Sequence, residues 1–475
     1  MSPIWSGVYE RIGNGNLGIM PTSPVGTILA VGPCSGGTPN KIYYYGKADA
    51  GAVRGELGYG DLVERLHDFL SLCGAKSKAI VIPAEKDVPG AVSVADRCSG
   101  SGTHYVTSGG DPQMTTMVVT QIVTGGGFDE ATFRYSLDGE SWSEVMDVPA
   151  TPGEAVELVA GLQVAFNDDY PSDGSFVGDD SWAWFAAGAS CSLTSLLAAL
   201  NVAKEAKNLP YELGCVFMPT GSATWSGLGS WAEGLFAERH RSIRMLAESP
   251  LANPDETANE YVTSRLVEID GFAHDRVMVC TALVIANDLA GKQYGRGISG
   301  MVAGLIAKAP VQASIGDPQL YQLADVLKLW IKDMTATHLQ TLDEARYIVP
   351  RWYEGMAGWF VNNGNMAANA TSDFQDLEVC RVLDNAIRNV RVTALKNIHK
   401  KVRVVNGVAD PIGLKALEGK CQNTLNGLKD TCSAARIEIP EGQDVLATKT
   451  INANISVVPF GYAKAINLNF ALAKF

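Results

Sequence analysis

Residues 24–32, Pro-Val-Gly-Thr-Ile-Leu-Ala-Val-Gly, form the stretch that decides the fold. Its centre, Thr27 to Val31, is a short apolar run bounded by glycines, which is the pattern of a buried strand. Asp61 to Leu72 follows with apolar residues at helical spacing, and Ala79 to Ile82 is a second short apolar run. The packed part of the chain therefore begins with a strand, a helix and a strand, the unit from which helix-covered parallel sheets are built.

The same alternation returns later in the chain. Helices are predicted near 192–206, 229–241, 256–267 and 298–308, and strands at 213–218, 243–247 and 277–285. Between Val92 and Ala187 the sequence instead has short stretches of alternating apolar and polar residues, broken by Gly-Gly-Gly at 125–127. This pattern indicates an all-β module, which interrupts the α/β domain as an insertion.

The last quarter of the chain has a third kind of sequence pattern. A long amphipathic helix is predicted from Ser372 to Lys401, with an apolar stripe of Val379, Leu383, Ile387, Val390, Ala394 and Ile398. Two stretches of period two then indicate strands. Their apolar positions are Ile451, Ala453, Ile455 and Val457 in the first and Ile466, Leu468, Phe470 and Leu472 in the second.

The fold class that follows is α/β (or α+β) and multidomain, with an α/β core, an inserted all-β domain and strand-forming terminal arms. The expected parts are a Gly- and Pro-rich extended arm (1–24), the α/β domain (25–91 and 189–340), the β insertion (92–188), a C-terminal domain with the long helix (341–449) and a C-terminal β arm (450–475).

Charge is distributed unevenly. Residues 128–180 hold thirteen acidic residues and the single basic Arg134, whereas Arg381 to Arg403 holds seven basic residues and the single acidic Asp384. Surfaces of opposite sign suggest different neighbours, although solvated faces that aid solubility explain them equally well. An acidic block repeated on every copy of an assembly would repel itself inside it, so we expect the insertion to face outward.

Composition excludes several classes of protein. No apolar run approaches the roughly 18 residues of a membrane span, and the start lacks the layout of a signal peptide, so no membrane insertion and a cytoplasmic site of synthesis are expected. The nine cysteines are scattered and include no C-x-x-C pair, which disfavours a disulfide framework or a zinc site.

Motifs for chemistry are weak. Gly13, Gly15 and Gly18 match G-x-G-x-x-G, but prolines follow where a helix should begin. Ser299 lacks the G-x-S-x-G spacing of a nucleophile elbow and is expected to cap a helix. Asp138-Gly139 predicts a tight hairpin turn. We expect no catalytic residue, no cofactor and no metal, and hence not an enzyme.

These stretches together resemble the contractile tail sheath family of long-tailed phages, R-type tailocins and related injection machines. The resemblance rests on residues 24–32, 79–83, the small-residue helix that runs into Ala-Pro at 300–310, residues 345–351 and the final helix and strands. Asn362 to Asn365 only approximates the family's Asn-rich motif, which places the chain in a divergent branch such as that of Mu-like phages.

The resemblance implies a structural subunit that polymerises as stacked rings in a helical tube around an inner tail tube, and contracts to drive that tube through a target cell envelope. The implied partners are further copies of the chain, the tube protein, and baseplate and terminator proteins, with no direct nucleic-acid contact. The implied location is the virion or tailocin tail, assembled in the host bacterial cytoplasm. The alternatives are another tail component, such as a terminator or baseplate protein, a surface-acting hydrolase or a secreted adhesin.

Two sets of site residues follow as hypotheses. Arg381 and Arg388 lie seven residues apart on one face of the long helix, with Arg391 nearby, and this basic side is expected to face the tube while the apolar stripe packs into the domain. Both arms are expected to pair with strands of other copies. The C-terminal residues proposed for this pairing are Ile451, Ile455, Val457, Ile466, Leu468 and Phe470.

Overall fold

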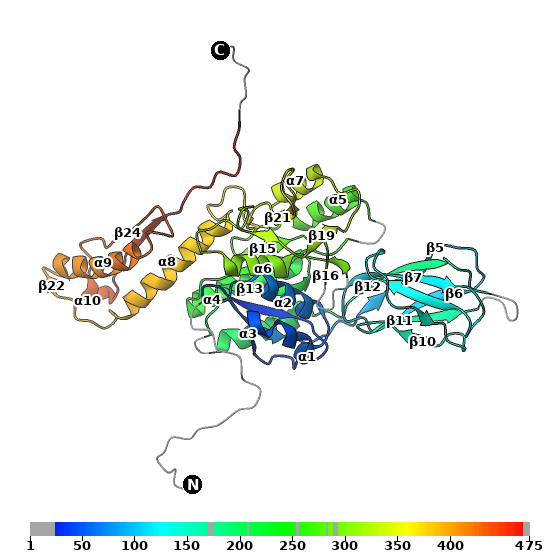
Figure 1. Cartoon of the computed structure of the whole chain (residues 1–475). Coiled ribbons are helices and arrows are strands. Elements are labelled where there is room, and N and C mark those ends of the chain that lie inside the picture. Colours follow the sequence, from blue (N-terminus) through cyan, green and yellow to red (C-terminus); the bar gives the residue numbers. More distant parts are fainter. Residues whose placement is uncertain are drawn as a thin grey trace, which may run out of the picture.

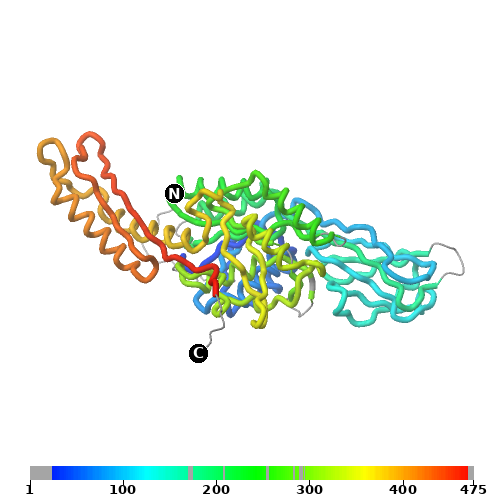
Figure 2. Tube along the Cα trace, turned by 90° about the horizontal axis from the view of Figure 1, so that it is seen from above, coloured from blue at the N-terminus to red at the C-terminus, as the bar shows by residue number. Residues whose placement is uncertain are grey.

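The computed structural model describes residues 24–168, 175–206, 209–252, 256–281, 284–287 and 293–468. They form an elongated molecule with an α/β core in the middle, a β unit at one end and a helical unit at the other (Figure 1). A view from above shows the same order, with the two end units on opposite sides of the core (Figure 2).

The core is built on a six-stranded sheet of order β15-β14-β13-β1-β3-β2. Its bounds are β1 Thr27–Gly32, β2 Tyr43–Gly46, β3 Lys78–Pro83, β13 Leu213–Pro219, β14 Arg244–Glu248 and β15 Val277–Cys280. All neighbouring strands run parallel except β2, which pairs antiparallel with β3 at one edge. Both faces of β1 are buried, which explains its continuous apolar run.

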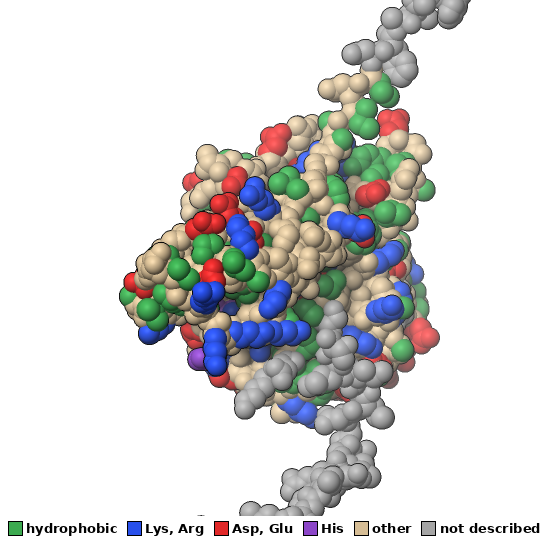
Figure 3. All heavy atoms as spheres, turned by 90° about the vertical axis from the view of Figure 1, so that its left-hand side faces the viewer, with side chains coloured by type: hydrophobic (Ala, Val, Ile, Leu, Met, Phe, Trp, Pro, Cys, Tyr) green, Lys and Arg blue, Asp and Glu red, His purple; other side chains and the backbone are tan. Residues whose placement is uncertain are grey.

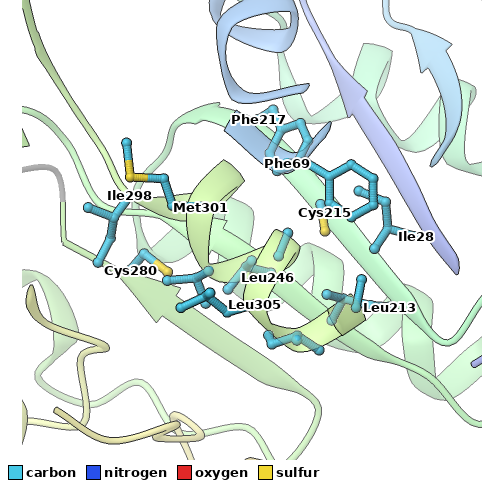
Figure 4. Packing of buried hydrophobic residues seen from close by; sticks show 14 of the residues in the cluster. Ile28, Phe69, Leu213, Cys215, Phe217, Leu246, Cys280, Ile298, Met301 and Leu305 are labelled. Atoms are coloured by element: carbon cyan, nitrogen blue, oxygen red, sulfur yellow. The ribbon is translucent and has the colours of Figure 1, made fainter. Parts of the chain in front are cut away.

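Helices cover both faces of this sheet. The helices α2 (Asp61–Leu72) and α6 (Ser299–Lys308) pack on one face. The opposite face is covered by α3 (Leu193–Glu205), α4 (Ser222–Arg239), α5 (Ala258–Ile269) and α7 (Ala336–Glu344). Figure 4 shows Met301 and Leu305 of α6 among Leu213, Cys215 and Leu246 of the strands.

Two glycines let α6 approach α2 closely. A Cβ atom added at Gly300 would lie 2.1 Å from the carbonyl oxygen of Arg65, and one at Gly304 would lie 3.0 Å from that of Phe69. The helix predicted at 300–310 therefore has small residues at these positions because it packs directly on the backbone of α2.

The inserted β unit contains two sheets whose strands pair antiparallel. Its strands are β4 Ala91–Val92, β5 Asp96–Ser99, β6 Tyr105–Gly110, β7 Thr116–Thr124, β8 Thr132–Ser136, β9 Met146–Asp147, β10 Ala155–Glu157, β11 Leu162–Asn167 and β12 Ser181–Ala187. Phe133, Phe166 and Phe176 lie in its buried core together with Trp182 and Trp184. The turn predicted at Asp138-Gly139 is confirmed, because the Asp138 carboxylate accepts hydrogen bonds from the backbone of Glu140 and Ser141.

Side chains fix the insertion to the core. The Thr115 hydroxyl donates to Asp61 of α2 at 3.4 Å, and Lys328 forms an ion pair with Glu140 at 2.5 Å. Lys328 belongs to a small sheet of β16 (Val284–Asn287), β17 (Gln293–Arg296) and β19 (Val326–Leu329) beside the main one.

The C-terminal unit consists of two long helices, α8 (Leu377–Leu395) and α9 (Pro411–Asn426), and an antiparallel pair, β24 (Ala434–Glu438) and β25 (Asn454–Val458). The remaining elements are η1 Lys47–Ala52, α1 Val53–Leu57, β18 Gln322–Leu323, β20 Pro350–Arg351, β21 Trp359–Val361, β22 Val404–Val405, β23 Val408–Ala409 and α10 Val445–Thr448.

The α/β multidomain fold class is confirmed, and the helices and strands predicted for the core are present. Three details differ. The strand expected at 277–285 is two strands in different sheets, the long helix is shorter at both ends than 372–401, and residues 465–468 form no strand. The arm expected at 1–24 lies outside the described residues except for Pro24.

Candidate assembly interface

The C-terminal unit is joined to the core through the buried carboxylate of Glu212, which directly precedes β13. Its Oε1 accepts a hydrogen bond from the backbone N–H of Gly26 at 2.8 Å and one from Arg381 of α8 at 3.1 Å. Its Oε2 lies 3.7 Å from the guanidinium of Arg388, also on α8. One side chain thus connects the start of β1, the start of β13 and the long helix.

A second buried pair lies beside the first. Arg244 of β14 donates two hydrogen bonds to Asp384 of α8, both at 2.9 Å, and the Ser242 hydroxyl donates to the same carboxylate at 2.5 Å. Burial is the largest single effect on Arg244 and disfavours its charged form, but Asp384, Cys380 and Asp275 together oppose it and the pKa of Arg244 is raised. For Arg388 burial dominates and lowers its pKa, with Glu212 opposing the shift. Charged pairs of this kind hold α8 in one orientation on the core.

The expectation of a free basic face on the long helix is wrong for two of its three arginines. Arg381 is 4% exposed and bonded to Glu212, Ala309 and Pro310, and Arg388 is turned toward Glu212 and Ser242. Arg391 is half-buried and has no such contact among the described residues. The helix therefore packs on the core through these arginines and Asp384, together with the apolar Leu377 and Cys380.

The apolar stripe of the helix is correspondingly less buried than expected. Val379, Leu383 and Ile387 are half-buried, and Ile398 is 57% exposed. Only Val390 of the predicted stripe is fully buried, against α9 and β24.

The free basic charge lies at the tip of the unit instead. After α8, the residues from 396 to 403 contain four exposed cations and no acid, and we call these cations the basic tip; they are Lys396, Lys400, Lys401 and Arg403. Figure 3 looks at this end of the molecule and shows Lys and Arg side chains gathered on its lower half.

The first predicted strand of the C-terminal arm is present as β25, but one of its edges is paired with β24 of the same chain. β25 pairs with β24 so that Ile455 lies opposite Ile437 and Val457 opposite Ala435. Ile451 precedes the strand. Beside the pair runs an apolar groove of about 550 Å³, whose lining includes Val390 and Ile398 from the α8 side and Ile451 and Ile455 from the strand side.

Beyond β25 the chain leaves its own unit and crosses to the core (Figure 2). There the Tyr462 hydroxyl donates to the carbonyl of Gln312, and Lys464 pairs with Asp376 at 2.5 Å. Burial raises the pKa of Tyr462 to about 12. Ile466 and Leu468 are 78% and 70% exposed, and Phe470 lies outside the described residues.

Titratable groups also cluster in the core. Arg65 pairs with Glu248 at 2.7 Å, and Arg296 pairs with Asp68 at 2.7 Å. The Ser299 hydroxyl donates to Glu248 at 2.6 Å and so links α6 to β14. The expectation that Ser299 caps the helix is wrong, because the N-cap residue is Ile298. These groups are buried and paired among themselves. Within the described ranges, no group of three or more His, Cys, Asp or Glu side chains is placed to hold a metal ion, and no helix is long and apolar enough to cross a membrane.

Sequence reasoning missed Glu212 as the anchor of the long helix. It is 169 residues from Arg381 along the chain, and nothing in its local pattern distinguishes it from a surface glutamate.

Comparison with solved structures defines the class of fold. The chain aligns with a protein of an extracellular contractile injection system, the PVC sheath complex in the contracted state, at a TM-score of 0.54 and 9% identity, covering 99% of this chain and 98% of that one. The anti-feeding prophage helical sheath in the contracted state gives a TM-score of 0.52 at 11% identity, covering 99% of both chains. The fold is therefore that of contractile sheath proteins.

The sequence defines the family. A model described as the DUF2586 N-terminal domain matches residues 5–365 and the DUF2586 C-terminal domain matches residues 373–474, so the chain belongs to the DUF2586 family. It is also 30% identical over 149 residues to a protein named "Putative tail sheath protein" from Haemophilus phage HP1 (strain HP1c1). That match covers 30% of this chain and 37% of the phage protein, so the chain spans about a third of the length of this relative.

Proposed function

We propose that the chain is a structural subunit of a contractile tail sheath in a phage-type or tailocin-type particle, and that it polymerises as a helical tube around an inner tail tube. The fold of contractile sheath proteins and the partial match to a phage tail sheath protein support this function. The observation that carries it in this molecule is the C-terminal unit, which leaves a strand edge and an apolar groove without a covering segment among the described residues.

The subunits are linked by strand pairing. Residues 465–472 alternate large apolar side chains with alanine or asparagine, and their described part, 465–468, is exposed and unpaired. Tyr462 and Lys464 hold this segment away from the β24–β25 pair of its own chain. The segment adds to β25 of a second copy, where backbone hydrogen bonds bind it and the groove accepts its apolar side chains.

The insertion faces outward in the tube. Residues 92–188 contain fifteen acidic residues and two arginines, a net charge of −13 that equals the net charge of the whole chain. Packing such blocks against one another along a tube would cost electrostatic energy, whereas solvent and salt screen them on the outside.

The opposite end faces the inner tube. The basic tip, with Arg391 behind it, contacts an acidic surface of the tube protein. Arg381 and Arg388 position this end by fixing α8 on the core, so they act on the tube contact without touching the tube. A weak charged contact that recurs once per subunit gives firm attachment through repetition.

Electron microscopy of the purified full-length chain tests the function directly. Long hollow tubes with helical order are expected, because every subunit carries both the segment and the edge that receives it. Isolated rings that never lengthen would indicate a terminator instead. A chain that stays monomeric at high concentration, with an intact fold by circular dichroism, would contradict the proposal.

A further inference from the structure

The outer edge of β24 is closed by two side chains of α9. Gln422 donates from its Nε2 to the carbonyl of Ala435 at 2.9 Å and accepts from the N–H of Ile437 at 3.0 Å through its Oε1. Glu418 accepts from the N–H of Ile439 at 2.8 Å. The Gln422 amide therefore supplies one donor and one acceptor, as the peptide group of a neighbouring strand would.

This closure determines which way the backbone of β25 points. In an antiparallel pair, opposite residues alternate between those bonded to each other and those whose N–H and C=O point away. Ala435 and Ile437 turn these groups toward α9, so the residues opposite them, Val457 and Ile455, turn theirs toward the other edge.

A second glutamine extends the same arrangement. Gln443 pairs with both backbone groups of Asn452, accepting from its N–H at 2.7 Å and donating to its carbonyl at 2.9 Å. The alternation then directs the backbone of Ile451 and Ala453 outward as well. From 451 to 457 the outer edge is paired with no strand in the part of the chain that the structure describes.

We propose that Gln422 and Glu418 are specificity-determining residues for assembly, because they fill the outer edge of β24 and restrict strand addition to the edge of β25. The inference rests on the strand pairing in the proposed function. It goes further in two respects. Each β24–β25 pair has one edge to which a strand can add, and the strand that adds there is residues 466–472 of a second copy.

The dimensions of edge and segment agree. The open edge, 451–457, and the segment, 466–472, are each seven residues long. The edge residues line the groove together with Val390 and Ile398, so a strand added there places Ile466, Leu468, Phe470 and Leu472 over an apolar floor. The edge of β24 has helix α9 beside it and offers no such floor.

One acceptor edge matters because a hairpin open on both sides binds two segments. Unpaired strand edges are general sites of unwanted association. In a polymer, a second acceptor would branch or cross-link the chains.

The test uses the full-length chain in dilute, unassembled form and a synthetic peptide of residues 463–475 as the probe. The double variant Gln422→Ala/Glu418→Ala opens β24, and Asn423→Ala on the exposed side of the same helix is the matched control. Peptide stoichiometry is measured by sedimentation, and protection of the Ile437 and Ile439 amides by hydrogen exchange.

The wild type and the control are expected to bind one peptide per chain, and the double variant two. At high concentration the double variant should form branched or bundled polymers. Unchanged stoichiometry in the double variant, with the Ile437 and Ile439 amides now exchanging freely, overturns the inference and leaves the proposed function standing.

Failure of the proposed function has a different signature, since the wild type then binds no peptide and forms no tubes. In that case, too, the double variant tests the closure of the β24 edge. Binding of one peptide by the double variant supports the closure, and binding of none overturns it. A melting temperature within a few degrees of the wild type confirms that the double variant is folded.

Discussion

The inserted β unit and the C-terminal unit lie at opposite ends of the core (Figure 1), and they differ in how completely they bury their apolar side chains. The insertion encloses one cluster of seventeen buried residues. The C-terminal unit has two clusters of only five and three, beside an open groove. The insertion buries its apolar core within the chain, whereas the C-terminal unit leaves an apolar groove that, in the proposed assembly, a segment of another copy would cover.

The largest effect is expected from breaking the C-terminal unit away from the core. Glu212→Ala leaves the buried Arg381 and the half-buried Arg388 without their carboxylate and should cost about 3–5 kcal/mol of unfolding free energy. Chemical denaturation of the soluble chain measures it. Glu238→Ala, which removes an exposed partner of Lys204, is the control and should leave stability unchanged. A small loss at Glu212 would show that α8 does not depend on this anchor.

The next test separates the two ends directly. Phe166→Ala in the insertion removes a side chain that is 1% exposed and should cost about 3–5 kcal/mol, with tubes still forming because the assembly edge is untouched. Ile455→Ala, at a position 43% exposed, should barely change stability but should weaken tube formation. Hydrogen exchange locates the first effect and electron microscopy the second. The reverse pattern would show that the insertion, and not the C-terminal unit, carries the assembly contacts.

Two buried acids of the core make stability depend on pH. Burial raises the pKa of Asp61 to about 6 and that of Asp68 to about 7, in each case against the opposing effect of nearby arginines. Both values lie above those of an unfolded chain, so the folded state binds more protons between about pH 4 and pH 7, and the contribution of these groups to stability falls as pH rises through that range.

Urea denaturation at pH 4.5 to 7.5 should show this slope in the wild type and a smaller one in Asp61→Asn/Asp68→Asn. The comparison cancels the opposite contribution of His67 and His274, whose pKa values burial lowers. Equal slopes in both proteins would show that the two carboxyls are charged in the fold throughout this range.

The smallest effect on stability is expected at the basic tip. Replacing Lys396, Lys400, Lys401 and Arg403 by Glu should change unfolding free energy by only about 0.5 kcal/mol or less per substitution, because all four are exposed. Attachment to the inner tube should be lost, and in the wild type it should weaken with added salt. Co-sedimentation with tube protein measures this. The control Lys76→Glu/Lys332→Glu should bind normally, and equal binding by the tip variant would place the tube contact elsewhere.

Periodicity predicted the core well. Strands β1 and β3 and helix α2 follow from short apolar runs and a helical stripe, since both faces of the sheet are covered and apolar positions report burial there. The insertion was equally visible, because β7 and β12 alternate buried and half-buried residues along their length.

The interface could not be predicted in the same way. On α8 the apolar stripe suggested the packed face, but the charged Arg381 and Asp384 are also buried because Glu212 and Arg244, more than 100 positions away, pair with them. In the arm, period two identified β25 but could not indicate that β24 takes one of its edges and that Gln422 fills the next. In both places the outcome depends on partners outside the segment itself, which its local pattern does not encode.

The carboxylate of Glu212 has a mechanical consequence. It is bonded to the backbone of Gly26, just before β1, and to Arg381 on the helix that carries the far tip. A tension applied to the chain before Gly26 and one applied along α8 would therefore meet at the same few atoms, beside the first residues of the central strands β1 and β13. The core would transmit such a load from one connection to the other as a short rigid strut, and it would bend little under it because its packed interior is nearly incompressible.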